Sequence, residues 1–224
     1  MYDAIIVVNG ELPQPPTWQD LPYRTLICTD GAANYFSQLT ITPDIIIGDM
    51  DSISVGTQFT MAKSLQTQFP NSKIVVNSDQ HTTDFEKCLI FAQQNAIKRI
   101  LCIGALGKAA DHAIYNLSLI ARYQTTLEIT LLNIYDTHRQ WVFPLHNQTQ
   151  IEAPIDSQVS LFPLSEVLIT TSGLKWELNQ ETISPLSKGA IRNISVKSET
   201  SIEVDGPCLC FVICDIPPNV QFSS

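Results

Sequence analysis

Short apolar runs rich in β-branched residues recur through the first part of the chain, and patterns of helical period lie among them. The runs are apolar along their whole length, as expected of strands that are covered on both faces. We therefore predict strands at Ala4–Val8, Thr25–Thr29, Asp44–Ile47, Lys73–Val76, Arg99–Ile103 and Leu127–Ile134. Helices are predicted at Ala32–Leu39, Thr57–Gln68, Asp84–Asn95 and Asp111–Tyr123. This order predicts an α/β fold with a doubly wound, largely parallel sheet.

The pattern changes after about Tyr135, where short strand-like runs follow one another without convincing helices. Pro, Gly, Asn and Ser separate these runs, which is typical of a small antiparallel β-sandwich. We expect an α/β domain over residues 1–137 and a β-sandwich domain over residues 138–224, with an irregular tail after Pro217-Pro218. The predicted strands are Gln140–Phe143, Gln158–Phe162, Val167–Thr171, Asn193–Lys197, Ser201–Val204 and Leu209–Cys214.

Composition narrows the class of protein. Of the 224 residues, 44% are apolar and 16% are charged, which supports a packed core and excludes a disordered chain. The net charge is −9, and a surface this acidic repels a nucleic-acid backbone. A nucleotide can still bind where a metal ion or backbone N–H groups supply local positive potential.

The cysteines and the N-terminal sequence bear on the compartment. None of the six cysteines forms a Cys-x-x-Cys pair, so we expect buried free thiols in a reducing environment. The apolar run Ala4–Val8 is too short for a membrane span or a signal peptide, and no basic segment precedes it. We therefore expect a cytoplasmic protein that binds neither membranes nor nucleic acids.

The segment Gly48–Ser52, with the sequence Gly-Asp-Met-Asp-Ser, follows an apolar run directly. In extended backbone Asp49 and Asp51 point the same way, so their carboxylates would project together from a strand end. Two close carboxylates repel each other unless a proton or a cation intervenes, and Mg²⁺ suits such a pair together with phosphate oxygens. The alternative is a polar turn in which the aspartates cap backbone N–H groups.

The segment Thr83–Lys87 begins a predicted helix. Thr83 and Glu86 have the spacing of a capping box, which is a sufficient structural reason for both. Asp84 and Lys87 are three positions apart and share a helix face, so one could reach a metal ion and the other a phosphate group. An ordinary capped helix with an ion pair is the alternative.

Two further segments link a predicted strand to a helix. Asp30–Asn34 combines an aspartate with small residues that allow close approach to the backbone, and a helix N-terminus there suits phosphate. Gly104–His112 contains two glycines, with Asp111 as a candidate helix cap and His112 as a candidate nucleotide contact. Because all these segments follow strands of one predicted parallel sheet, we expect them to meet at one edge of it.

In this order the segments resemble the motifs of the thiamin pyrophosphokinase (thiamine diphosphokinase) family. Ser172–Trp176 and, more loosely, Asn193 extend the resemblance into the second half of the chain, so that it covers nearly the whole sequence. The resemblance implies a homodimer that transfers the diphosphate of ATP to the hydroxyl of thiamin, giving thiamin diphosphate and AMP. It also implies Mg²⁺ as cofactor and a thiamin pocket between the first domain and the β-domain of the partner chain.

The resemblance assigns roles by matching position. Catalysis and metal binding fall to Asp49, Asp51 and Asp84, with Asp30 as a further metal ligand. Thiamin contacts fall to Trp176 and Asn193, although Trp176 could instead be a core residue of the β-domain. The candidate nucleotide contacts are Asp30, Asn34, Lys87, Lys108, Asp111 and His112.

The chain departs from the family pattern at several positions, among them two that change the charge. Ala109 stands where the family has an arginine, and Lys108 could replace the charge of that arginine but not its bidentate fork. Arg192 stands where the family has a serine. Two other functions therefore stay open: diphosphate transfer to another small alcohol, and thiamin binding with weakened catalysis.

Overall fold

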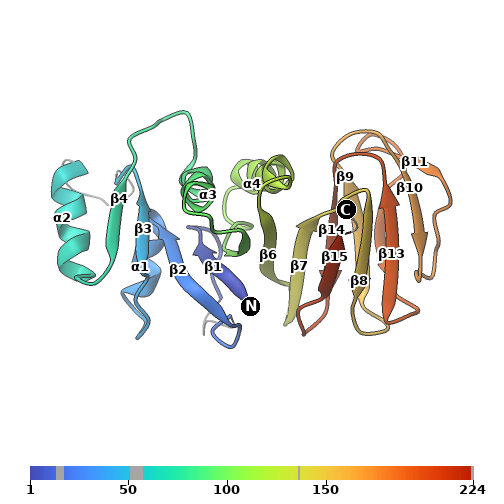
Figure 1. The fold of residues 1–224 in the computed structure, drawn as a ribbon, viewed down its shortest axis with the longest axis horizontal. Coiled ribbons are helices and arrows are strands. Elements are labelled where there is room, and N and C mark those ends of the chain that lie inside the picture. Colours follow the sequence, from blue (N-terminus) through green and yellow to red (C-terminus); the bar gives the residue numbers. More distant parts are fainter. Residues whose placement is uncertain (14–17, 51–57, 136, 223–224) are drawn as a thin grey trace. The chain divides into compact units, whose positions relative to one another are not determined.

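The computed structural model of this chain describes residues 1–13, 18–50, 58–135 and 137–222. The chain forms two compact units, one of residues 1–119 with 123–129 and the other of residues 120–122 with 130–224 (Figure 1). The assignment of separate functions to residues 1–137 and 138–224 stays a prediction. No helix in the described part of the chain is both long and apolar enough to cross a membrane.

A parallel sheet forms the centre of the first unit. Every strand pairs in parallel with its neighbours within the order β5-β1-β2-β3-β4, as predicted for this part of the chain (Figure 1). Strands β1, β2, β3 and β5 are buried along most of their length, which explains their continuous apolar sequences, whereas the residues of the edge strand β4 are half-buried or exposed. Their bounds are Tyr2–Val7 for β1, Tyr23–Thr29 for β2, Ile45–Gly48 for β3, Lys73–Val76 for β4 and Arg99–Ile103 for β5.

Helices connect these strands. They are η1 (Asp30–Ala32), α1 (Ala33–Phe36), α2 (Gln58–Gln68), α3 (Asp84–Gln94) and α4 (Ala110–Tyr123). Helix α3 packs against β2 and β3, and α2 lies beside β4.

The predicted helix Ala32–Leu39 is wrong in extent, because α1 is a single turn that ends at Phe36. The hydroxyl of Ser37 donates a hydrogen bond to the carbonyl oxygen of Asn34 at 2.6 Å. Such local bonds compete with the helical pattern and favour an early end.

The prediction of buried free thiols is confirmed, since all six cysteines are free and buried. Burial raises the pKa of each thiol, to about 12 for Cys208 and about 11 for Cys214. The thiols therefore stay protonated and pack as small apolar side chains.

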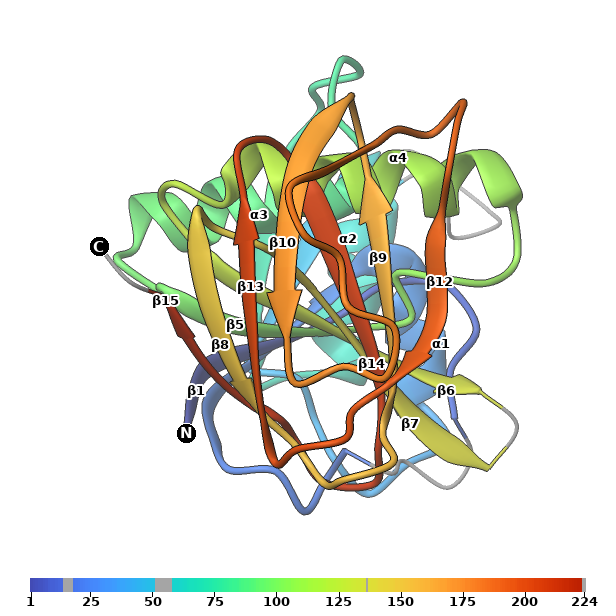
Figure 2. The same cartoon turned by 90° about the vertical axis from the view of Figure 1, so that its right-hand side faces the viewer.

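Two antiparallel sheets form the second unit, which confirms the predicted change of fold type (Figure 2). Burial alternates along strands such as β10 and β13, so one face of each is covered and the other is open to solvent, as in a sandwich. The first sheet has the order β12 (Ala190–Ile194), β9 (Gln158–Pro163), β14 (Cys208–Ile213), β7 (His138–Pro144) and β6 (Glu128–Tyr135). The second has the order β11 (Glu181–Ile183), β10 (Val167–Ser172), β13 (Glu199–Val204), β8 (Gln148–Glu152) and β15 (Asn219–Phe222).

Two predictions for this unit are wrong. The tail after Pro217-Pro218 is not irregular, because β15 pairs with β8; the prolines precede the strand and remove no N–H from its ladder. The strand predicted at Asn193–Lys197 ends at Ile194, because the next two N–H groups bond outside that sheet pairing. Ser195 donates to the Ser157 carbonyl at 3.0 Å and Val196 to the Gly173 carbonyl at 2.8 Å.

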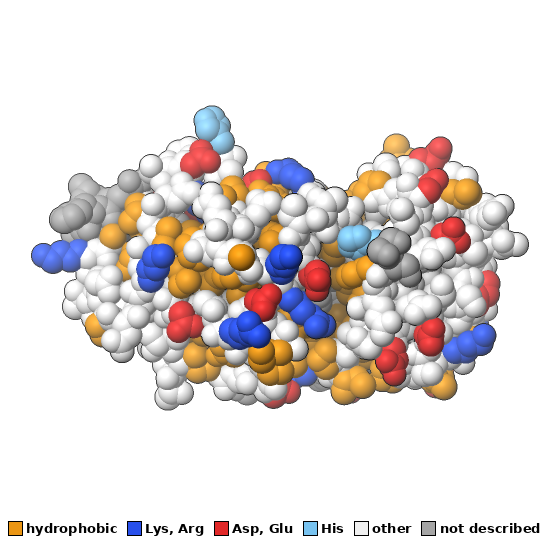
Figure 3. Space-filling view, viewed as in Figure 1, with side chains coloured by type: hydrophobic (Ala, Val, Ile, Leu, Met, Phe, Trp, Pro, Cys, Tyr) orange, Lys and Arg blue, Asp and Glu red, His pale blue; other side chains and the backbone are white. Residues whose placement is uncertain are grey.

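Acidic and basic side chains are interspersed over the face of the molecule drawn in Figure 3. The described residues on that face form no extended basic surface, in agreement with the net charge of −9.

Candidate active site

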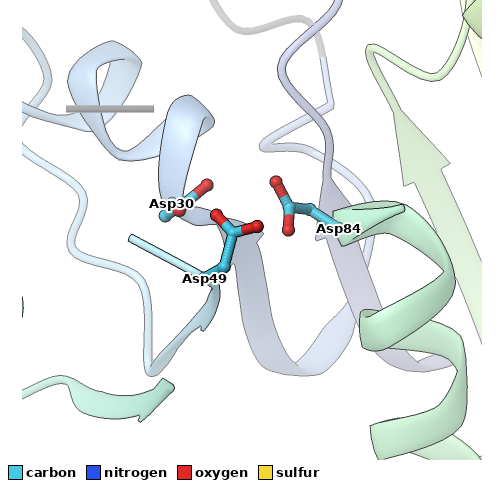
Figure 4. Close-up of side chains that lie close together, drawn as sticks. All are labelled: Asp30, Asp49 and Asp84. Carbon is cyan, nitrogen blue, oxygen red and sulfur yellow. The ribbon is translucent and has the colours of Figure 1, made fainter. Parts of the chain in front are cut away.

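Three aspartates meet at the carboxyl edge of the parallel sheet (Figure 4). Asp30 directly follows β2, Asp49 directly follows β3, and Asp84 is the first residue of α3. One oxygen of each carboxylate lies within 4.8 Å of the others. The structure therefore brings together three of the four predicted acidic residues, and the fourth, Asp51, lies outside the described residues.

The ammonium group of Lys87 binds two of these carboxylates. Its Nζ lies 2.9 Å from Oδ1 of Asp84 and 3.3 Å from Oδ2 of Asp49, and only 1% of its side chain is exposed. Burial alone would lower the pKa of Lys87, but the hydrogen bonds and charges of Asp84 and Asp49 outweigh burial and raise it. Lys87 is therefore charged and offsets part of the repulsion between the two carboxylates.

Asp30 is fully buried and accepts hydrogen bonds from two backbone N–H groups. Its Oδ1 accepts from Gly31 at 2.6 Å and its Oδ2 from Met50 at 2.8 Å. Burial, together with the charges of Asp84 and Asp49, raises the pKa of Asp30 to about 7, although the two backbone hydrogen bonds oppose the rise. Asp30 thus supports the backbone that carries Asp49, besides lying within reach of a shared metal ion.

The start of α3 confirms one half of the predicted capping box. Oγ1 of Thr83 accepts a hydrogen bond from the Glu86 N–H at 3.3 Å, so Thr83 is the N-cap. The Glu86 carboxylate accepts hydrogen bonds from the hydroxyls of Tyr115 at 3.0 Å and Tyr123 at 3.3 Å. Both tyrosines belong to α4, so Glu86 links the helix that carries Asp84 to its neighbour.

A hollow of about 330 Å³ lies beside the aspartates. Asp49, Asp84 and Lys87 line it, as do Lys108 and Ala109 from the turn between β5 and α4 and His112 from the first turn of α4. The predicted convergence of these segments on one edge of the sheet is therefore confirmed. Ala109, at the position of the family arginine, is exposed.

Two of the predicted nucleotide contacts lie elsewhere. Asn34 lines a neighbouring hollow of about 390 Å³, which Lys108 borders as well. Asp111 is exposed, and its Oδ1 accepts from the His112 N–H at 2.9 Å. The interpretation of Asp111 as a helix cap is wrong, because α4 has Ala109 at its N-cap, with no side-chain hydrogen bond there.

Sequence reasoning missed two residues at this edge of the sheet. Gln80 donates a hydrogen bond from Nε2 to Oδ2 of Asp49 at 3.0 Å, and Asn9 lines both hollows. Asn9 follows shortly after β1, so the rule that ligands bind beyond strand ends could have found it. Gln80 lies in a connecting segment with no pattern that points to a site.

The residues predicted to contact thiamin lie together in the second unit. The alternative of Trp176 as a core residue is wrong, because 56% of it is exposed. Asn193 is buried and fixes the backbone of Trp176, since its Oδ1 accepts from the Trp176 N–H at 3.1 Å and its Nδ2 donates to the Trp176 carbonyl at 2.7 Å. The Lys175 ammonium lies 4.9 Å from the centroid of a Trp176 ring. The indole therefore projects from a fixed backbone as an exposed aromatic surface.

Comparison with known proteins gives the same family over both units. Residues 17–131 match the family model described as "Thiamin pyrophosphokinase, catalytic domain", and residues 148–209 match "Thiamin pyrophosphokinase, vitamin B1 binding domain". Thiamine pyrophosphokinase 1 of Arabidopsis thaliana is 28% identical, in an alignment that covers 92% of this chain and 84% of that protein. Thiamine pyrophosphokinase 1 of Oryza sativa subsp. japonica is 27% identical, covering 90% of this chain and 82% of that protein.

Solved structures share the fold. Thiamine pyrophosphokinase from Bacillus subtilis superposes with a TM-score of 0.73 at 22% identity, covering 96% of this chain and 99% of that one. Thiamin pyrophosphokinase from Candida albicans gives a TM-score of 0.77 at 18% identity, covering 96% and 90%. At these identities the structures establish the fold, and the catalytic-domain model, which by itself spans more than half of the sequence, establishes the family. This chain belongs to the thiamin pyrophosphokinase family.

Proposed function

We propose that Asp49, Asp51 and Asp84 bind Mg²⁺ together with the phosphates of ATP, and that diphosphate transfer to thiamin takes place beside them. As a member of this family the chain is an ATP-dependent diphosphotransferase, a thiamine diphosphokinase. The observation that carries the proposed site is the cluster of Asp30, Asp49 and Asp84 at the carboxyl edge of the sheet, with oxygens within 4.8 Å of one another.

The residues present fit Mg²⁺. This cation prefers oxygen ligands, commonly one or two carboxylates, and leaves other positions to phosphate oxygens and water. Asp49 and Asp84 point toward one another from different elements (Figure 4), and a single ammonium group shared between two carboxylates leaves negative charge for a cation to offset. When bound, Mg²⁺ would supply positive charge that reduces the repulsion between ATP and the attacking oxygen.

The reaction forms one bond and breaks another at the β-phosphorus of ATP. The thiamin hydroxyl oxygen bonds to that phosphorus, the bond to the oxygen of the α-phosphate breaks, and AMP leaves. The hydroxyl proton passes to a nearby carboxylate, for which Asp51 and Asp84 are the candidates. The chain's own contribution is mainly positioning and charge, as is usual for phosphoryl-type transfer.

The proposed nucleotide contacts surround the two hollows. Lys87, Lys108 and His112 line the hollow beside the aspartates, which supports contacts with the phosphates. Asn34 lines the neighbouring hollow, and Asp111 lies at the start of α4 close to His112.

Trp176 and Asn193 are proposed to form the thiamin side of the site in a homodimer. An exposed aromatic face suits a flat, cationic ring, and Asn193 holds the backbone from which the indole projects. Ile191, Leu186 and Val196 are also exposed, by 60%, 97% and 47%, which supports contact with a second copy of the chain. Sedimentation of the wild type and of Ile191→Asp tests the homodimer, since the proposal predicts a wild-type dimer that the charge weakens. A monomeric wild type at assay concentrations contradicts it.

A cytoplasmic location is proposed on the strength of the six free, buried thiols, which suit a reducing compartment. Fractionation of the source cells would test it, and enrichment in an oxidising compartment would contradict it.

An assay of AMP and thiamin diphosphate formation from ATP, Mg²⁺ and thiamin tests the proposed reaction. The wild type should release AMP and thiamin diphosphate in equal amounts. A panel of other small alcohols, assayed by AMP release, tests substrate choice. Thiamin binding without AMP release, in either Mg²⁺ or Mn²⁺, would instead favour a protein with weakened catalysis.

A further inference from the structure

Asn9, which lies outside every motif described above, holds the ammonium group of Lys108. Nζ of Lys108 donates to Oδ1 of Asn9 at 2.8 Å and to the backbone carbonyl oxygen of Asn9 at 3.2 Å. Both acceptors are uncharged, and one residue supplies both. The position of the Lys108 ammonium therefore depends on Asn9.

The side chain of Asn9 is itself held in place by Gly31. A Cβ atom at Gly31 would lie 2.4 Å from Nδ2 of Asn9, so the amide packs directly on the glycine that follows Asp30. With Nδ2 on that side, Oδ1 accepts the hydrogen bond from Lys108, which an amide nitrogen could not do. The orientation of Asn9 is thus tied to the turn that carries the aspartate cluster.

The backbones that carry the two residues are also in close contact. Val8 donates from its N–H to the carbonyl of Ile103 at 2.8 Å. A Cβ atom at Gly10 would lie 1.8 Å from the carbonyl oxygen of Gly104, so only glycine permits this approach. Lys108 has a positive φ of 55°, which turns the chain at the end of the β5–α4 connection. The segments that follow β1 and β5 therefore pack closely together and carry Asn9 and Lys108, respectively.

Lys108 differs in charge environment from the other lysine that lines the hollow. Lys87 is buried and forms ion pairs with Asp49 and Asp84, so its charge is largely offset. Lys108 is exposed, borders both hollows and forms no ion pair with a carboxylate in the described part of the chain. An ammonium group has three N–H donors, and Asn9 takes two of them. One donor and a full positive charge remain for an anion.

We propose that Asn9 is a positioning residue that holds the Lys108 ammonium at the border of the two hollows, where it binds a phosphate oxygen of the nucleotide. This inference rests on the proposed function and adds to it a residue that presents the cation. Without Asn9, the Lys108 side chain would become ordered only when phosphate binds. Because binding would then include the entropy cost of ordering that side chain, the affinity for phosphate would fall.

Calorimetric titration with inorganic tripolyphosphate and with α,β-methylene-ATP, whose α–β bridge is not cleaved, tests the inference without turnover. Asn9→Ala and Lys108→Ala should each weaken binding by about tenfold, the usual size of a lost charge-assisted hydrogen bond. The double variant should bind no more weakly than Lys108→Ala, because Asn9 acts through Lys108. The exposed residues Lys63 and Asn71 provide matched controls, since neither is among the described residues that line the two hollows, and Lys63→Ala and Asn71→Ala should bind like the wild type.

Asn9→Asp gives an independent check, because its shape is conserved and packing against Gly31 is kept. The new carboxylate would pair with Lys108 and repel phosphate, so binding should be weaker than in Asn9→Ala. Wild-type affinity in Asn9→Asp, or effects of Asn9→Ala and Lys108→Ala that add in the double variant, would overturn the inference. Because the titrations need neither thiamin nor AMP release, their result is separate from that of the reaction assay.

Discussion

Oδ2 of Asp30 accepts a hydrogen bond from the backbone N–H of Met50 at 2.8 Å, between the ends of the neighbouring strands β2 and β3. Met50 is buried and has a positive φ of 65°, which is uncommon for a residue with a side chain. The bond stabilises that backbone conformation, and Asp49, one residue earlier, lines the hollow as a result. The buried Asp30 thus stabilises the backbone at the end of β3, from which the candidate metal ligand Asp49 projects.

Gly48→Ala should disrupt this arrangement, because a Cβ atom there would lie 2.3 Å from Cγ of Asp30. We expect the free energy of unfolding to fall by roughly 1–3 kcal/mol, as for other overpacked sites, and Mg²⁺ affinity to fall with it. Urea denaturation and metal titration measure the two effects. Gly189→Ala is the control, since its Cβ atom would meet only Ile191 at an ordinary 3.6 Å. Equal stability of Gly48→Ala and the wild type would contradict this account of the turn.

Lys87→Met should destabilise the metal-free protein, because it removes the cation shared by Asp49 and Asp84. Breaking a buried ion pair costs roughly 3–5 kcal/mol, and the loss here should lie toward the lower end because Asp84 is partly exposed. Mg²⁺ should raise the Tm of the variant more than that of the wild type, since it binds the folded state and offsets the negative charge that Lys87 balances in the wild type. Thermal unfolding with and without Mg²⁺ measures this difference.

The control for that experiment is Lys188→Met, which removes the ammonium from an exposed pair with Glu181. Exposed pairs contribute only about 0–1 kcal/mol, so its Tm should change little and should respond to Mg²⁺ like the wild type. If the Tm of Lys87→Met and its response to Mg²⁺ match those of Lys188→Met, Lys87 does not stabilise the charges of Asp49 and Asp84.

The fold was predictable where local pattern and burial agree. Strands β1, β2, β3 and β5 are largely buried, and the predicted apolar runs coincide with β1 to β5 to within about two residues, although the edge strand β4 is half-buried or exposed. The missed strands β8, β11 and β15 are short or polar on one side, and β15 exists because β8 offers it a partner. Pairing between distant segments leaves little trace in local sequence.

The acidic cluster was predictable for a different reason. Residues that follow parallel strands must meet at one sheet edge, which places Asp30 and Asp49 together whatever their local role. The separate roles of the residues at this edge were not predictable, because those roles depend on hydrogen bonds between segments. That Asp30 accepts from Met50, that Gln80 reaches Asp49 and that Asn9 holds Lys108 emerges only from the folded structure.

Trp176→Ala should separate binding from stability. Because Trp176 is 56% exposed, loss of its indole should lower Tm only slightly while raising the KM for thiamin. Trp141 is the matched comparison: it is fully buried, and its Nε1 donates to the Cys214 carbonyl at 3.0 Å. Trp141→Ala should cost roughly 3–5 kcal/mol of stability. An unchanged thiamin KM in Trp176→Ala would remove the tryptophan from the substrate site.

Stability should fall in alkaline solution. Burial raises the pKa of Cys208 to about 12 and of Cys214 to about 11, above the ordinary thiol pKa of 9.0. Between the ordinary thiol pKa and the raised pKa of the folded state, the folded state holds protons that the unfolded state has lost. The free energy of unfolding therefore decreases as pH rises through this range. The stability is fully present below the unfolded pKa and is lost toward the folded pKa.

Urea denaturation at several pH values from about 8 to about 10.5 measures this decline. Cys214→Ser keeps a hydroxyl in place of the thiol that donates to the Ile216 carbonyl, but it does not titrate in this range. Its stability should therefore fall less steeply with pH than that of the wild type. A flat pH dependence for the wild type would show that the thiols do not control alkaline stability.

The most direct test of the proposed metal site is the kcat for AMP release from ATP and thiamin at saturating Mg²⁺, compared among the wild type, Asp49→Ala and Asp84→Ala. Both carboxylates lie in one cluster at the edge of the hollow and share Lys87, so each variant should lose activity by at least about a hundredfold with its fold intact. Near-normal kcat in both variants would contradict the assignment of Mg²⁺ to this cluster.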